Sequence, residues 1–297
     1  MTDPNATRRG SRQATGNRSG AIGGGTLLLD SLSATAVAAY STRKLRAAYA
    51  GSAIRVVRAS DSTQQDVGFT GSDLNTTSLT TFCSGTTCTI VKWYDQTANA
   101  NDITTLVGAG AGGPQVYSGG VLTFASSGKA SLHYIDTTTK GLMTTAGSPN
   151  QAQPYTVAIV NKTTVNTGNS HMTDGNSGGA TRALVGFVGA IGSTAYEMFA
   201  QNSVNTGGTS DANAHGFIAT FDDAHTNSAL YEDNTAIIAA NNTTGTANFN
   251  QQNIACGDGE AHILDGDIPE FIVFTSAISS GDRGTIRTSW NTYWGTP

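Results

Sequence analysis

The most informative stretch of the chain is CSGTTCTIVKWYDQTANAND, residues 83–102. Two cysteines, Cys83 and Cys88, enclose a short loop, and the β-branched and aromatic run at residues 89–94 predicts a strand. The strand leads into a polar turn whose members are Asp95, Gln96, Asn99, Asn101 and Asp102. Polar side chains at the rim of a sheet could hold a sugar or a metal. Because Asp and Asn are also the commonest turn residues, a purely turn-forming role is the alternative.

The composition of the chain predicts an all-β domain with many short strands and turns. Its 297 residues include 36 glycines, and only 12% are charged. A chain of this length can form one large β-sandwich, and the low charge and high glycine content disfavour long helices. We therefore expect a single antiparallel sandwich over residues 26–297.

Residues 1–25 differ from the remainder and are expected to form an extended basic arm. They contain Arg8, Arg9, Arg12 and Arg18 against Asp3, and almost no apolar side chains. Such a segment cannot bury enough surface to order itself, so a larger assembly of other subunits would have to hold it. The rest of the chain has 12 basic and 20 acidic residues, a net charge of −8, which disfavours binding to nucleic acid.

The pattern of apolar residues predicts two helices and more than ten strands. An early helix is expected at residues 41–49, with Ser41 as its cap, and a closing helix at residues 279–294. A hairpin is expected from residues 53–59 and 64–69. Further strands are expected at 115–117, 121–124, 131–134, 155–161, 182–188, 196–201, 216–221, 228–231, 253–257 and 267–274.

Cysteine content and hydropathy limit the cellular setting. The chain has no run of about 18 apolar residues, so no membrane span is expected, and no signal peptide is evident. Cys83 and Cys88 are close enough to pair, which leaves Cys256 alone. Outside cells this pair could be oxidised; inside, two thiols would be more usual.

Two parts of the chain resemble known proteins. Residues 155–294, with PYTVAIVNK, HGFIATFD and DIPEFIVFTSAISSGDR, resemble concanavalin A-like or laminin G-like jelly rolls. The front half, with AYSTRKLRAAYAGSAIRVVRASDSTQQDVGF and FCSGTTCTIVKWYDQTANANDIT, resembles the jelly-roll catalytic domain of fungal-type α-L-arabinofuranosidases. The resemblance implies an antiparallel jelly-roll sandwich and a retaining glycosidase, which needs two carboxylates about 5 Å apart.

The same resemblance implies positions for the two carboxylates. The acid/base Asp of the family corresponds to Asp258, within Cys-Gly-Asp. The nucleophile's segment matches Phe-Ala-Gln-Asn, which places Gln201 beside Asn202 where a Glu is needed. An amide cannot act as that nucleophile, but Glu197 lies four residues earlier on the same strand face and could supply the carboxylate. The adjacent cysteines of the family have no match at residues 171–179.

Other residues are candidates for binding a ligand. Aromatic rings stack on sugars, so Trp93, Tyr94 and Tyr196 are candidates, although Trp93 suits a core position equally well. The candidate ligand-binding set is Trp93, Tyr94, Asp95, Gln96, Asn101, Asp102, Tyr196, Gln201, Asn202 and Asp258. A calcium site is one interpretation of a second, acidic group, and a solvated loop is the other. The members of this group are Asp258, Glu260, His262, Asp265 and Asp267.

Two functions follow as hypotheses. The first is a bacteriophage virion protein of the tail, fibre or capsid surface, present in multiple copies, held by residues 1–25 and displaying a lectin-like domain that binds a surface glycan. The second is an extracellular retaining hydrolase of the α-L-arabinofuranosidase type, with Asp258 and Glu197 as its carboxylates. No cofactor is expected for either, apart from the open question of calcium.

Overall fold

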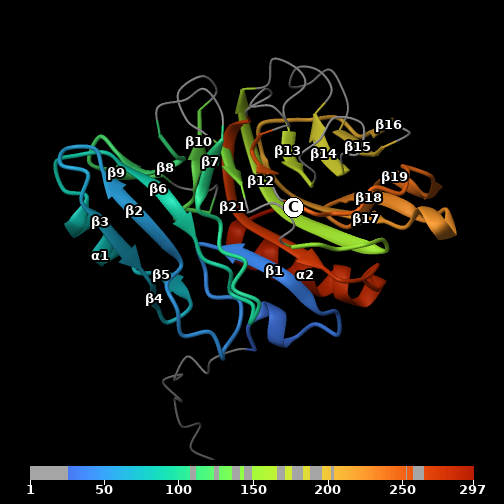
Figure 1. Cartoon of the computed structure of the whole chain (residues 1–297), viewed down its shortest axis with the longest axis horizontal. Coiled ribbons are helices and arrows are strands. Elements are labelled where there is room, and N and C mark those ends of the chain that lie inside the picture. Colours follow the sequence, from blue (N-terminus) through green and yellow to red (C-terminus); the bar gives the residue numbers. More distant parts are fainter. Residues whose placement is uncertain are drawn as a thin grey trace, which may run out of the picture.

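The computed structural model describes the body of the chain (Figure 1). The described residues are 26–107, 112–123, 127–135, 141–143, 149–165, 171–175, 183–187, 196–201, 204–251, 253–256 and 264–297. The expected arm at residues 1–25 lies outside them. Every strand pairing within this part of the chain is antiparallel.

Two large sheets form the jelly-roll sandwich that the composition predicts. The first has twelve strands, in which β1 adds to β21 and β9 to β8. Its path is β19 (Thr235–Asn242), β18 (Ser228–Glu232), β17 (Ala214–Phe221), β12 (Tyr155–Val165), β21 (Asp265–Phe274), β10 (His133–Tyr134), β8 (Gln115–Ser118), β6 (Cys88–Trp93), β2 (Ile54–Arg58) and β3 (Gln64–Val67), with β1 (Ala36–Ser41) and β9 (Val121–Leu122) beside it.

The second sheet has seven strands, and its strands β13, β14, β15 and β16 lie above β17, β18 and β19 of the first sheet in Figure 1. Its order is β16 (Val204–Gly207), β15 (Tyr196–Ala200), β14 (Ala183–Phe187), β13 (His171–Asp174), β20 (Asn253–Ile254), β11 (Gly141–Met143) and β7 (Thr105–Val107). A separate two-stranded sheet joins β4 (Phe69–Thr70) to β5 (Asp73–Leu74).

Apolar side chains alternate between the two faces of the central strands of the larger sheet, so each face contributes to a separate hydrophobic core. On β12, Val157 and Ile159 face the second sheet and join a cluster that includes Met198. The intervening Ala158 and Val160 belong to another cluster, which packs against α2 (Ser280–Trp294). A strand with apolar residues on both faces is buried on both, so β12 is covered by the second sheet on one side and by α2 on the other.

Helix α2 confirms the expected closing helix. Ser279 caps it by accepting a hydrogen bond from the Asp282 backbone N–H at 3.0 Å, and Gly295 ends it in the left-handed conformation. Its buried residues Ile286, Trp290 and Trp294 recur at helical spacing, which is why the sequence pattern identified it. Within the part of the chain described, no helix is long and apolar enough to cross a membrane.

The helix expected at residues 41–49 is wrong. Ser41 is the last residue of β1, and the following backbone groups bond to distant partners. The N–H of Lys44 donates to Ser72 O at 2.8 Å, and that of Leu45 to Gln96 Oε1 at 2.8 Å. Tertiary hydrogen bonds therefore replace the helical ladder. The early α-helix is instead α1 (Thr76–Phe82), capped by Asn75 and preceded in the chain by the 3-10 turn η1 (Leu28–Asp30).

The other strand predictions agree with the structure. The hairpin forms from β2 and β3, with Ile54 opposite Val67. Each of the ten further expected strands coincides with an observed strand, although β9, β10 and β20 are only two residues long. Cys83 and Cys88 form a disulfide between the end of α1 and the start of β6. Cys256 is buried as a free thiol.

Candidate functional site

Strand β15 carries the candidate catalytic carboxylate on the outward face of the second sheet. Tyr196, Met198 and Ala200 are buried in the sandwich core, whereas Glu197 is half-buried. Because side chains alternate along a strand, Glu197 points away from the core that holds its neighbours. Gln201 follows the strand and is exposed.

The strands beside β15 place further residues in register with Glu197. Gly186 of β14 lies directly opposite it on one side, and Thr206 of β16 on the other. Directly paired residues share a face of the sheet, so these positions flank Glu197, and Gly186 is itself buried. His171 of β13 pairs with Gly186 and so occupies the next position of the same row. The row crosses β13, β14, β15 and β16 on the face of the sheet that carries Glu197.

Gln201 lies at the exit of β15 in an unusual backbone conformation. Its φ is 82°, and its Oε1 accepts a hydrogen bond from Thr246 Oγ1 at 3.4 Å. This conformation is uncommon for a residue with a side chain, and it turns the chain sharply at the rim of the sheet. The partner positions Asn202 and Asp258 lie outside the described residues.

The polar turn after β6 is tied into the protein. Asp95 is buried, and its Oδ1 accepts from the N–H groups of Ala39 and Thr97, each at 2.9 Å. Gln96 is also buried, and its Nε2 donates to Ser41 O at 3.1 Å and Arg43 O at 2.8 Å. These two side chains hydrogen-bond to the backbone of β1 and of the segment that follows it. Asp95 and Gln96 thus have the structural role that was considered as the alternative to ligand binding.

The remaining predicted residues of this stretch also have protein partners. Trp93 is fully buried, so its ring has no face open to a sugar. The Tyr94 hydroxyl donates to Asp66 Oδ1 at 2.7 Å. Burial first, and then this hydrogen bond, raise the pKa of Tyr94 to about 12. Asp102 forms an ion pair with Lys92 at 2.7 Å, and the Asn101 Nδ2 donates to the backbone of β1.

Tyr196 belongs to the core as well. It is 1% exposed, and its ring packs on Phe217 with centroids 4.6 Å apart. Burial first raises the pKa of Tyr196 far above its usual value, and the Glu232 carboxylate, to which its hydroxyl is hydrogen-bonded, adds to this effect. Tyr196 therefore lies in the sandwich core, whereas Glu197 of β15 and Gln201 directly after it are not among the buried residues.

His215, isolated in the sequence, lies among carboxylates in the structure. Its Nδ1 is 2.5 Å from Asp233 Oδ2 and 3.5 Å from Glu232 Oε1, and its Nε2 is 2.9 Å from Asp211 Oδ1. Burial alone would lower the pKa of His215, but the hydrogen bonds to Asp233 and Asp211 raise it to about 9. The sequence contained only a weak signal, the Asp-x-x-x-His spacing of Asp211 and His215, and this spacing by itself does not specify a site.

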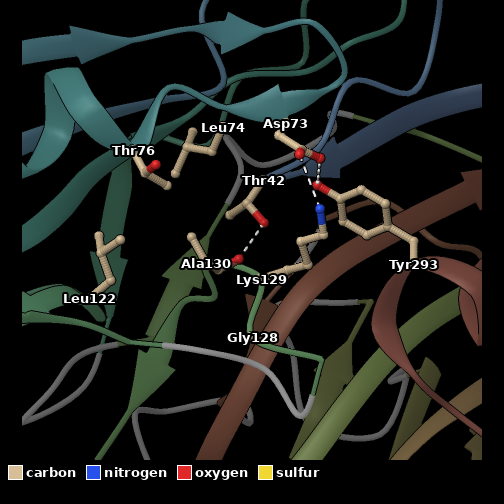
Figure 2. A pocket seen from close by; sticks show the side chains of 9 residues that line it. All are labelled: Thr42, Asp73, Leu74, Thr76, Leu122, Gly128, Lys129, Ala130 and Tyr293. Atoms are coloured by element: carbon tan, nitrogen blue, oxygen red, sulfur yellow. Dashed lines mark hydrogen bonds and ion pairs between the residues drawn. The ribbon is translucent and has the colours of Figure 1, made fainter. Parts of the chain in front are cut away.

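A pocket of about 290 Å³ opens between β5, the segment before β10 and the end of α2 (Figure 2). Asp73 accepts from Tyr293 Oη at 2.6 Å and from Lys129 Nζ at 3.0 Å. Arg43 and Lys129 both lie over the Tyr293 ring, at 4.8 and 4.7 Å from its centroid. The side chains of Asp73, Lys129 and Tyr293 satisfy one another. Sequence reasoning did not identify this pocket because its residues come from four segments that are far apart in the sequence.

The acidic group considered for calcium is only partly described. Asp265 Oδ1 accepts from Thr164 Oγ1 at 2.5 Å, and Asp267 Oδ1 is 3.1 Å from His133 Nδ1. The other members, Asp258, Glu260 and His262, lie outside the described residues.

Comparison with known proteins supports the arabinofuranosidase resemblance. The sequence model of the family "Alpha-L-arabinofuranosidase B, catalytic" matches residues 28–148. A probable alpha-L-arabinofuranosidase B of Aspergillus terreus is 34% identical over 117 residues, which is 36% of this chain and 23% of that protein. Alpha-L-arabinofuranosidase B of Emericella nidulans is 39% identical over 83 residues, 27% of this chain and 16% of that protein.

Solved structures support the fold over a longer range. A GH54 α-L-arabinofuranosidase mutant soaked with 4-nitrophenyl α-L-arabinofuranoside aligns with a TM-score of 0.65 at 19% identity, over 88% of this chain and 63% of that one. An arabinofuranosidase complexed with arabinofuranosyl-α-1,2-xylobiose aligns with a TM-score of 0.67 at 18% identity, with the same coverage. The chain thus has an arabinofuranosidase-like jelly-roll fold, and it spans under a quarter of the curated relatives it matches. These relatives support the hydrolase alternative and lend no support to the virion role.

Proposed function

We propose that the protein is an extracellular glycoside hydrolase of the α-L-arabinofuranosidase type. The observation that carries the proposal is the match of residues 28–148 to the catalytic domain of that family, joined to a fold that aligns with GH54 enzymes over 88% of the chain. The Cys83–Cys88 disulfide fits an oxidising compartment outside the cell.

The proposed chemistry assigns one role to each of two carboxylates. Glu197, on the outward face of β15, is the proposed nucleophile that attacks the anomeric carbon and forms the glycosyl–enzyme intermediate. Asp258 is the proposed acid/base group, which protonates the leaving oxygen and then activates water.

Gln201 supplies the competing hypothesis, a protein of the same fold that binds arabinose-containing glycans without cleaving them. If the nucleophile's position in the fold is that of Gln201 rather than Glu197, the chain lacks the carboxylate that a retaining mechanism needs. The exposure of Gln201 at the rim of the sheet is the observation that favours this reading.

Release of nitrophenol from 4-nitrophenyl α-L-arabinofuranoside by the pure protein tests both hypotheses. The hydrolase proposal requires turnover that Glu197→Gln abolishes and that Asp258→Asn reduces by roughly 10²- to 10⁴-fold. Asp61→Asn, in the turn of the β2–β3 hairpin, is the matched control and should leave turnover unchanged. No turnover by the wild type, combined with turnover by Gln201→Glu, would contradict the proposal and support the binding-only alternative.

A further inference from the structure

Four side chains meet at the outer edge of the larger sheet, away from the Glu197 row. His215 lies on β17, Glu232 is the last residue of β18, Asp233 begins the turn after it, and Asp211 precedes β17. One nitrogen or oxygen atom from each of His215, Glu232 and Asp233 lies within 4.8 Å of the other two. An imidazole and two carboxylates at this separation form a donor set that divalent transition metals accept.

Backbone groups hold two of these carboxylates in place. Asp233 and Asn234 have φ values of 48° and 69°, which form the tight turn between β18 and β19. The other carboxylate oxygen of Asp233 accepts from the Gly216 N–H at 2.9 Å, which leaves Oδ2 directed at His215. Asp211 accepts from the Asn213 N–H at 2.7 Å through Oδ1, the same atom that contacts His215 Nε2.

This arrangement orients the imidazole as in metal sites of proteins. A histidine ligand usually donates its second ring N–H to a carboxylate, and here Nε2 faces Asp211 Oδ1 at 2.9 Å. Nδ1 is then the atom that faces Glu232 and Asp233. Two ligands bonded to one zinc ion at about 2.0–2.1 Å in a tetrahedron lie roughly 3.3 Å apart. The 3.5 Å between Nδ1 and Glu232 Oε1 fits this spacing, and the 2.5 Å to Asp233 Oδ2 requires a side-chain shift of under about 1 Å.

The charges of the cluster also favour a cation. Three carboxylates surround one imidazole, and the side chains of His215, Glu232 and Asp233 are only 13%, 16% and 13% exposed. Among the ion pairs of the described residues, none joins these carboxylates to Lys or Arg. Even a cationic His215 imidazole leaves the three carboxylates with a net negative charge, which is costly where burial reduces screening and which a divalent cation would offset.

A neighbouring group adds a second observation. The Ser210 hydroxyl, next to Asp211 in the chain, is fully buried and has no hydrogen-bond partner among the described residues. Buried polar atoms without a protein partner are usually satisfied by water or an ion.

We infer that His215 Nδ1, Glu232 and Asp233 bind a divalent transition-metal cation of the Zn²⁺ class, with Asp211 orienting the imidazole. Ca²⁺ does not suit the site, because it prefers six to eight oxygen ligands and avoids imidazole. The metal would link β17 to the β18–β19 turn. Through the hydrogen bond between Tyr196 and Glu232 it would also stiffen the contact between the two sheets.

Zn²⁺ binding to the untagged, chelator-treated full chain tests this inference by calorimetry and by metal analysis after dialysis. We expect one Zn²⁺ per chain for the wild type, affinity at least 10-fold weaker for His215→Gln and for Glu232→Gln, and no comparable binding of Ca²⁺. His225→Gln is the matched control, because His225 faces a single carboxylate, with its Nδ1 2.6 Å from Asp222 Oδ1.

Several results would overturn the inference. These are no Zn²⁺ binding by the wild type, equal affinity in His215→Gln, equal loss in His225→Gln, and Ca²⁺ binding as tight as Zn²⁺ binding. If His215→Gln does not fold, Glu232→Gln decides the question, and Co²⁺ in the wild-type protein gives a visible absorption spectrum that reports tetrahedral nitrogen and oxygen ligation directly. Because all readouts measure metal binding, they are independent of the proposed hydrolase activity.

Discussion

Tyr196 and Glu197 are neighbours on β15, yet Tyr196 lies in the sandwich core and Glu197 on the outward face of the sheet. Substitutions at the two positions should therefore separate stability from activity. Tyr196→Ala removes a ring that packs on Phe217, and we expect it to lower the free energy of unfolding by about 3–5 kcal/mol. Glu197→Gln should abolish turnover with little change in unfolding. Denaturant titration and the nitrophenol assay measure the two effects, and a stable, inactive Tyr196→Ala would contradict this assignment.

A buried charge network joins α2 to the larger sheet. Glu270 of β21 accepts from Arg43 Nε at 2.7 Å and from the indole N–H groups of Trp290 and Trp294 at 2.7 and 3.0 Å. Glu270→Ala leaves the Arg43 guanidinium buried without its partner, so we expect a loss of about 3–5 kcal/mol in unfolding free energy. Disruption of the exposed Arg55–Asp66 pair by Asp66→Asn is the control and should have a small effect, because solvent screens that pair. If Glu270→Ala and Asp66→Asn lowered the unfolding free energy equally, the proposed difference between the buried network and the exposed pair would be refuted.

The pair His133 and Asp267 predicts a pH-dependent contribution to stability. The hydrogen bond to Asp267 raises the pKa of His133, and burial opposes this only in part. A group whose pKa is raised by folding stabilises the protein fully below its unfolded pKa, about 6.5 for histidine, and loses that contribution as pH rises through the folded value. The difference in unfolding free energy between the wild type and His133→Gln should thus be largest near about pH 5.5 and smaller near about pH 9. If the difference in unfolding free energy between the wild type and His133→Gln increased with pH, the proposed stabilising contact of His133 with Asp267 would be contradicted.

The Cys83–Cys88 disulfide closes a loop of low sequence separation, five residues. A loop this short loses little entropy on closure, so the double substitution Cys83→Ser and Cys88→Ser should cost only about 2 kcal/mol. Chemical unfolding with and without reductant measures the effect. The double variant should be insensitive to reductant, and equal stability of the wild type with and without reductant would contradict the prediction.

The sequence predicted those helices and strands whose apolar residues recur with the period of the element, because one face of each is buried. The β2–β3 hairpin and α2 follow from alternation and from Ile286, Trp290 and Trp294 at helical spacing. The segment after Ser41 could not be predicted in this way, because its hydrogen bonds go to Gln96 and Ser72, far away in the sequence. Helix α1 was missed because its Thr-rich sequence has low helix propensity, although Asn75 provides a cap.

The candidate site was predictable only where one strand carries it. Alternation along β15 places Glu197 outside the core, and its half-buried side chain between the buried Tyr196 and Met198 agrees, whereas Gln201 lies beyond the end of the strand. Asp95 and Gln96 are residue types that often bind ligands. Only the structure shows that their side chains already form hydrogen bonds with backbone groups of β1. The cluster at His215 depends on the pairing of β17 with β18, which no local pattern specifies.

The pairing of β1 with β21 has a consequence for how the protein is made. Ala36 lies opposite Phe274, so the first described strand meets its partner only after more than two hundred further residues have left the ribosome. Pairings of such long sequence separation form late and slowly. A nascent chain would therefore expose the apolar face of β1 throughout most of its synthesis, and we expect its yield to depend on chaperones that shield this segment until β21 arrives.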